Sequence, residues 1–148
     1  RGLKPGVSNL DEVIQLMGDP TMRWQDPDGS QRLAYPRGPA GFNTFMVTIG
    51  PDGRIISLNC VLNMKTFALI REGMTQEQVL RILGPSVAAW TIYFERRDEL
   101  VWEWRYCDPW NEPARFNVLF DNTTKKVRTT QGYPEVKRFR EWCGNELQ

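Results

Sequence analysis

The sequence contains no histidine, so it lacks the commonest general base and the commonest neutral metal ligand of proteins. Its 19 basic and 18 acidic residues nearly cancel, leaving a net charge of +1. That balance gives no bulk electrostatic reason to expect nucleic acid or an anionic membrane as a partner. No apolar run in the sequence approaches the roughly 20 residues of a membrane-spanning helix. These absences argue against histidine-based catalysis and against nucleic-acid binding.

Cysteine is also scarce, since Cys60, Cys107 and Cys143 lie far apart and form no Cys-x-x-Cys spacing. This spacing argues against a zinc site. Two interpretations stay open: three separate thiols, or one disulfide with an odd thiol, which requires an oxidising compartment. The chain opens at Arg1 rather than Met, so we expect further residues upstream in the gene product, where a signal peptide or lipid anchor would stand.

Candidate catalytic groups are equally few. The carboxylate pairs Glu95 with Asp98 and Glu103 with Asp108 lie close in sequence. Nothing around them indicates the desolvated cleft that raises one carboxyl pKa in a hydrolase. The glycine-rich segment 38–41 lacks the lysine and hydroxyl residue of a phosphate-binding loop. We therefore expect no enzyme, and no catalytic, cofactor-binding or metal-binding residues.

The sequence does contain an internal repeat. VIQLMG, which ends at Gly18, recurs as VLRILG, which ends at Gly84, 66 positions later, and Trp24 precedes Trp90 at the same offset. Further along the offset becomes 71, and a single five-residue insertion accounts for the change, at a hairpin tip where QDPDGSQ in the first half faces TIYFERRDEL in the second. At this second offset the alternating apolar residues align: Leu33 with Trp104, Tyr35 with Tyr106, Phe45 with Phe116, Val47 with Val118, and Ile49 with Phe120.

Each half is predicted to begin with a short helix. Ser8 with Asp11 three residues later, and Thr75 with Gln78 three residues later, have the spacing of N-terminal helix caps. Apolar pairs follow at helical spacing, and a glycine with a nearby proline ends each helix. Alternation and turn residues then predict strands at 32–37, 45–49 and 54–60, and at 100–107, 116–120 and 125–130.

Two further helices are predicted outside this repeat. One lies within 64–72 and packs through Phe67, Leu69 and Ile70, and the other closes the chain with Val136, Phe139 and Cys143 facing inward. The predicted fold is α+β, with two tandem helix–(helix)–β-meander repeats that form an antiparallel sheet with helices packed on one face. The expected boundaries are 1–62 for the first repeat, 63–133 for the second, and 134–148 for the closing helix.

The second half carries a family resemblance. GMTQEQVLRILGP at 73–85, the triplet Trp104-Arg105-Tyr106 and FNVLFD at 116–121 together resemble the SmpA/OmlA family. These are small bacterial outer-membrane lipoproteins that include the E subunit of the β-barrel assembly machinery. Two tandem copies are similar in architecture to the secreted β-lactamase inhibitor protein. The resemblance implies a domain at the periplasmic face of the outer membrane, held there by a lipid on an upstream cysteine.

The same resemblance implies a non-enzymatic module that contacts other envelope proteins, with the membrane reached only through its lipid anchor. Aromatic residues crowd the second half, and period-two alternation places Trp102 and Trp104 on one face of a strand and Glu103 and Arg105 on the other. Trp104 and Tyr106 are expected in the core. The predicted partner-binding residues are Trp90, Tyr93, Trp102, Glu103, Arg105 and Trp110.

Two other functions stay open. One is a β-lactamase-inhibitor-like protein that blocks an enzyme with hairpin loops and a concave aromatic sheet face, for which Asp28 or Asp52 would supply an acidic hairpin tip. The other is a domain that binds a small ligand or peptidoglycan by stacking on its aromatic residues.

Overall fold

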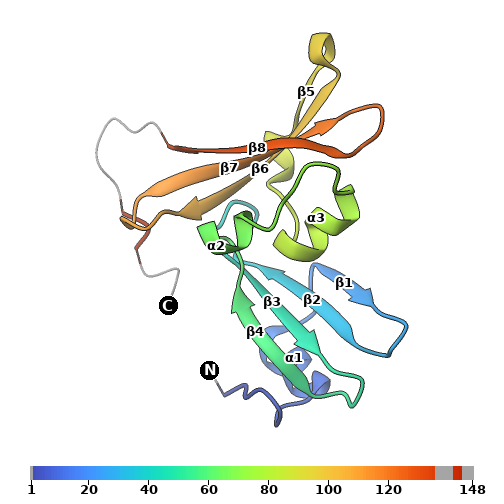
Figure 1. The fold of residues 1–148 in the computed structure, drawn as a ribbon. Helices are drawn as coiled ribbons and strands as arrows, with labels where there is room; N and C mark the ends of the chain where they lie inside the picture. Colours follow the sequence, from blue (N-terminus) through green and yellow to red (C-terminus); the bar gives the residue numbers. More distant parts are fainter. Residues whose placement is uncertain (1, 136–141, 145–148) are drawn as a thin grey trace.

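The computed structural model describes residues 2–135 and 142–144, and its elements fall into two successive halves (Figure 1). In the first half one helix precedes a four-stranded antiparallel meander. Its elements are α1 (Leu10–Met17), β1 (Met22–Gln25), β2 (Gln31–Pro36), β3 (Thr44–Ile49) and β4 (Ile55–Cys60).

The second half has the same order with additions: a second helix in front and two short 3-10 turns beside its first strand. The predicted α+β class with antiparallel strands is therefore confirmed. The elements are α2 (Met64–Phe67), α3 (Gln76–Leu83), η1 (Ala88–Trp90), β5 (Ile92–Phe94), η2 (Glu95–Arg97), β6 (Glu99–Cys107), β7 (Pro113–Asp121) and β8 (Val127–Pro134). No helix within the described ranges is long and apolar enough to cross a membrane.

The predicted N-terminal cap is correct for the helix of the second half and wrong for the helix of the first half. α3 begins at the predicted cap, since the Thr75 hydroxyl accepts from the Gln78 amide and the Gln78 side chain accepts from the Thr75 amide. The Ser8 cap predicted for α1 is wrong, because Asn9 forms the capping box with Glu12 instead. Ser8 is buried and accepts a hydrogen bond from the Lys4 amide.

The two halves do not share a sheet, so that prediction is wrong. β1 to β4 form one four-stranded sheet and β5 to β8 form another, each in sequence order. Figure 1 shows α2 and α3 between the two sheets, with α1 on the far side of the first. Burial explains this arrangement, because Val79 and Leu83 of α3 enter one core together with Ala34 of β2 and Trp104 of β6.

The first sheet is consequently buried on both faces. Leu33 and Tyr35 of β2 pack in a core with Val13 of α1. Ala34 between them points the opposite way, into the core that contains α3. A strand buried on both faces is apolar at successive positions rather than alternating, which is why β2 contains the run Leu-Ala-Tyr.

α2 places an aromatic ring on the second sheet. Phe67 is buried, stacks on Phe116 with ring centroids 3.9 Å apart, and meets Tyr106 edge-on at 4.9 Å. Ile70 is buried as predicted, whereas Leu69 is exposed. The prediction for Leu69 fails because α2 ends at Phe67 and Leu69 lies in the turn that follows.

The predicted closing helix lies largely outside the described residues, and so do Val136 and Phe139. Pro134 belongs to β8, one residue beyond the predicted end of the second repeat. Cys143 is described: it is buried and forms a disulfide with Cys107, the residue that ends β6, across a separation of 36 residues.

Candidate functional site

The β5–β6 hairpin projects from the body of the molecule (Figure 1). Within the described part of the chain, β5 is an edge strand of three residues that pairs only with β6. Its side chains are all exposed: Ile92 by 50%, Tyr93 by 48% and Phe94 by 38%. Three successive exposed apolar side chains beside a free strand edge form a surface that a partner protein can cover.

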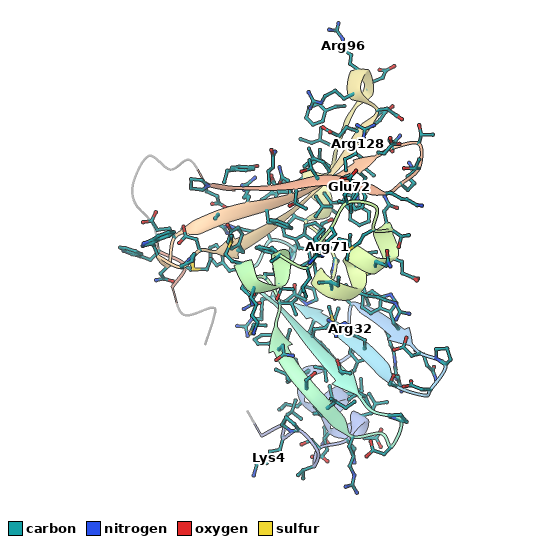
Figure 2. All side chains as sticks on the ribbon, viewed as in Figure 1. Lys4, Arg32, Arg71, Glu72, Arg96 and Arg128 are labelled. Carbon is teal, nitrogen blue, oxygen red and sulfur yellow. A yellow bond between two sulfur atoms is a disulfide. The ribbon has the colours of Figure 1, made fainter. Side chains whose placement is uncertain are left out.

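The hairpin tip carries charge. η2 turns the chain at Glu95–Arg97, and Asp98 completes the turn with a φ of 48°. Arg97 lies over the Phe94 ring, 4.3 Å from its centroid, and pairs with Glu99 at 3.1 Å. Figure 2 shows the Arg96 side chain extending beyond the tip, away from the body. The tip thus places the Arg96 cation at the outer end of the hairpin, in the turn that follows the exposed apolar residues of β5.

The turn between β7 and β8 braces the tip of this hairpin. The Asn122 amide donates to the Asp98 carbonyl at 2.8 Å, and the Thr123 hydroxyl donates to the Asp98 carboxylate. Arg128 donates to the Arg97 carbonyl at 2.7 Å and to the Asp121 carboxylate at 2.9 Å. These contacts hold the turn that joins β5 to β6 in place.

Asp121 at this brace is expected to titrate with a pKa of about 2 rather than its ordinary 3.8. The Thr124 amide is the largest cause and the Arg128 guanidinium the next. Because the folded pKa is lowered, the stability that Asp121 contributes is complete above about pH 4 and is lost as the pH falls toward 2.

Arg128→Gln should raise the pKa of Asp121 but leave it below 3.8, since the Thr124 and Thr123 amides remain. Carboxyl carbon NMR titration measures this. A pKa of 3.8 in the variant would show that the turn amides do not act as described.

The face of the second sheet that points away from α3 carries a partly buried ionic network. Glu103 accepts from Arg115 at 3.0 Å and from the Tyr133 hydroxyl. Glu135, whose side chain is 4% exposed, binds Arg105 at 2.7 Å and Arg115 at 3.3 Å. The pKa of Tyr133 is raised, first by burial and second by its hydrogen bond to Glu103. Both carboxylates are already paired, so this network fits structural support better than proton transfer.

Two aromatic rings cover the cations of this network. Trp90 lies over Arg115, with the guanidinium carbon 3.6 Å from the ring centroid. Phe42, from the loop between β2 and β3, lies 4.1 Å from the guanidinium carbon of Arg105. Cation–π contacts of this length are favourable when partly desolvated. The first half of the chain therefore contacts the ionic network of the second.

The predicted partner-binding residues do not form one surface. Glu103, Arg105 and Trp90 belong to the ionic network, and Tyr93 lies on the projecting strand. Trp102 lies on the opposite sheet face, half-buried against the core, with its ring centroid 4.7 Å from that of Phe120. Trp110, in the turn after β6, is 72% exposed. The structure thus leaves Tyr93 and Trp110 exposed and the other four partly or fully covered.

Several residues of these surfaces escaped the sequence analysis. Ile92 and Phe94 were missed because β5 was read as part of a hairpin insertion, although the alternation-free triplet Ile-Tyr-Phe could have indicated a short strand. Arg115 was missed because only the β6–β7 register, which pairs it with Arg105, brings it to the network. Glu135 and Tyr133 carried no local signal.

The acidic turns of the first half are engaged locally. The Asp28 carboxylate accepts from the amide and hydroxyl of Ser30, and these hydrogen bonds lower its pKa. The Asp52 carboxylate accepts from the Arg54 amide. Both residues are exposed at hairpin tips, as the inhibitor hypothesis requires, but their oxygens already shape their own turns.

The disulfide settles the alternatives for the cysteines: Cys107 and Cys143 are bonded and Cys60 is free. Burial raises the pKa of the Cys60 thiol, which makes it a poor nucleophile. In the part of the chain that the structure describes, no group of three or more Cys, Asp or Glu side chains is placed to hold a metal ion. Comparisons with protein-family models, with curated proteins and with solved structures found no match for this chain.

Proposed function

We propose that this protein is a non-enzymatic interaction module of the bacterial cell envelope, which contacts a partner protein through its β5–β6 hairpin. The observation that carries the proposal is the run Ile92, Tyr93 and Phe94, exposed on an edge strand that leads into a hairpin tip braced by hydrogen bonds. A preformed edge strand with apolar side chains binds an extended segment at a low cost in ordering. The charged tip at Arg96 and Arg97 would steer the encounter and fix its orientation.

The disulfide supports a location in an oxidising compartment. A bond between Cys107 and Cys143 persists where the surroundings are oxidising, as in the periplasm and outside the cell. The proposed location is the periplasmic face of the outer membrane, with a lipid on an upstream cysteine as the only membrane contact. This location follows from the SmpA/OmlA resemblance of residues 73–85, 104–106 and 116–121.

We further propose that the two halves are tandem copies of one unit, a helix with a four-stranded meander packed on it. The segment before each helix is tied to its fourth strand in the same way. The Gly6 amide donates to the Ile55 carbonyl at 2.7 Å, and the Ile55 amide donates to the Ser8 carbonyl at 2.8 Å. The corresponding bonds of the second half run from Gly73 to Val127 at 2.8 Å and from Val127 to Met74 at 2.9 Å.

The strand register supports the duplication, but it aligns the two halves differently from the sequence comparison. β-Bulges interrupt the pairing after Thr48 in the first half and after Leu119, 71 positions later, in the second. Tyr35 pairs with Phe45, and Trp104 pairs with Phe116, so the register matches Tyr35 with Trp104 rather than with Tyr106.

Hydrogen bonds agree with this match, since Tyr35 and Trp104 both donate to the glycine carbonyl that ends the preceding helix, Gly18 at 2.9 Å and Gly84 at 3.2 Å. Gly18 and Gly84 lie 66 positions apart, Tyr35 and Trp104 lie 69 apart, and the bulges lie 71 apart. On this alignment the five extra residues fall in two segments, three between Gly84 and Trp104 and two between Trp104 and Leu119, instead of in the single five-residue insertion expected from the sequence.

The proposed function is tested by changing the exposed strand without disturbing the core. A variant with Ser at Ile92, Tyr93 and Phe94 should fold with an unchanged melting temperature, since these side chains are exposed. In cells it should remain in the outer-membrane fraction but lose its complex on native gels. The matched control carries Ser at three exposed apolar positions elsewhere: Val7, Ile56 and Leu69. Recovery of the complex with the hairpin variant, or of the wild-type protein in the cytoplasm, would contradict the proposal.

A further inference from the structure

The first sheet has a cavity on the face that α1 covers only in part. α1 is eight residues long, and the cavity of about 490 Å³ opens beyond its last turn, at the end of β2 and the start of β3. Its size lies within the usual range of ligand sites, roughly 300–1,000 Å³. The residues that line it are Leu3, Leu16, Met17, Tyr35, Pro36, Arg37, Phe45 and Leu58.

The matching position in the second half is filled. Phe67 of α2 lies there, stacked on Phe116 and edge-on to Tyr106. Phe116 lies three residues before the bulge in the β7–β8 pairing, as Phe45 lies three residues before the bulge in the β3–β4 pairing. Phe45 therefore forms the floor of the cavity as Phe116 forms the floor beneath Phe67.

The residue beside this floor differs between the two halves: it is Tyr106 in the second half and Arg37 in the first. Tyr106 lies two residues beyond Trp104, the strand partner of Phe116. Arg37 lies two residues beyond Tyr35, the strand partner of Phe45, and its amide continues the β2–β3 ladder by donating to the Asn43 carbonyl at 2.9 Å. An exposed guanidinium, 5.7 Å from the Phe45 ring centroid, thus replaces the phenol that contacts Phe67.

We propose that this cavity binds an aromatic side chain of a partner polypeptide, presented beside an acidic residue. The ring stacks on Phe45 as Phe67 stacks on Phe116, and the fold already accepts such a ring from a one-turn helix, α2. Arg37 is the one charged residue among the described residues that line the cavity, so a neighbouring carboxylate gains a charge-assisted hydrogen bond there. This site is separate from the β5–β6 hairpin and does not depend on it.

The test uses short peptides that copy the sequence of α2. The probe is acetyl-NEKTFALI-amide, residues 63–70 with Glu in place of Met64, which puts the carboxylate three residues before Phe67 on the same helical face. One comparison peptide carries Gln in place of that Glu, and another carries Ala in place of Phe. Binding to the whole protein is followed by amide NMR shifts. We expect shifts around Phe45 and Leu58, no binding of the Ala peptide, and binding of the Glu peptide about five-fold tighter than the Gln peptide.

Two variants locate the effect. Arg37→Gln should abolish the preference for Glu over Gln while leaving a ring-dependent affinity. Leu16→Glu should abolish binding, because Leu16 lines the cavity and its 56% exposure lets the variant fold. Ile56→Glu, at a residue 58% exposed and outside the lining, is the matched control and should bind normally.

Three results would overturn the proposal. One is equal binding of the Phe and Ala peptides, and another is a set of shifts that maps away from the cavity. The third is binding of free 3-phenylpropionate without binding of any peptide, which would identify a small-molecule site instead. Loss of the hairpin-dependent complex in cells would leave all these measurements unchanged, so the two proposals fail independently.

Discussion

Gly84→Ala is expected to lower the free energy of unfolding by about 3 kcal/mol, whereas Gly18→Ala should lower it by about 1 kcal/mol. Both glycines end a helix with nearly the same backbone, φ 79° at Gly18 and 73° at Gly84, so both variants incur the cost of an alanine at positive φ. Only at Gly84 does an added Cβ meet the neighbouring sheet, 3.0 Å from the Thr44 methyl carbon. At Gly18 it meets nothing within 4 Å.

Urea denaturation of the two variants measures the difference directly. The excess loss at Gly84 reports how closely α3 approaches the first sheet, since the backbone term is shared. Equal losses in the two variants would contradict the arrangement in which α3 is packed between both sheets. Thr44→Ser in the Gly84→Ala background removes the crowded methyl group and should recover part of the loss.

Trp104→Ala should destabilise the protein by about 4 kcal/mol, the largest single effect we expect. The side chain is 1% exposed, lies in the core between the second sheet and α3, and donates to the Gly84 carbonyl at 3.2 Å. Its removal leaves a large cavity and an unpaired buried carbonyl. Thermal and chemical unfolding both measure the loss.

Trp110→Ala is the matched control, because that tryptophan is 72% exposed. It should change the free energy of unfolding by no more than about 0.5 kcal/mol. A similar loss in both variants would mean that Trp110 also packs in the core. A loss below about 1 kcal/mol at Trp104 would contradict the placement of that residue between the layers.

The sequence was most informative where the physical cause is local. The Thr75–Gln78 cap, the glycine ends of α1 and α3, and the turn at Pro51-Asp52-Gly53 each depend on a few neighbouring residues, and each is present in the structure. Ser8 and Asn9 are both residue types that cap helices well, and each precedes an acidic residue by three positions. Local chemistry alone does not choose between them.

The arrangement of the sheets depends on long-range packing, which the sequence expresses weakly. α3 is apolar enough on one side to cover a sheet, and nothing in its residues indicates that it also touches a second one. The buried run Leu33, Ala34 and Tyr35 was the available signal, since a strand apolar on both faces needs cover on both. The prediction of a strand at 32–37 did not use that signal.

Residue composition predicted which part of the chain holds the candidate site, and the structure showed which residues form it. The sequence placed the interesting residues in the second half, and Tyr93 does lie on the projecting strand. Arg105 and Glu103 were assigned to an open face, but Arg115, Glu135 and Tyr133 reach them from strand neighbours distant in sequence. The cavity above Phe45 was invisible in the sequence because it is defined by the ring that the second half has and the first half lacks.

The most direct test of the proposed contact surface is site-specific photocrosslinking in cells of the full-length protein. A photoreactive phenylalanine analogue is placed at Tyr93 on β5, or at Val7, which is also exposed and lies on the first half. We predict one crosslinked adduct of defined size at Tyr93, lost when Ile92 and Phe94 are changed to Ser, and no such adduct at Val7. No adduct at Tyr93, or the same adducts at both positions, would contradict the claim that the β5–β6 hairpin is the contact surface.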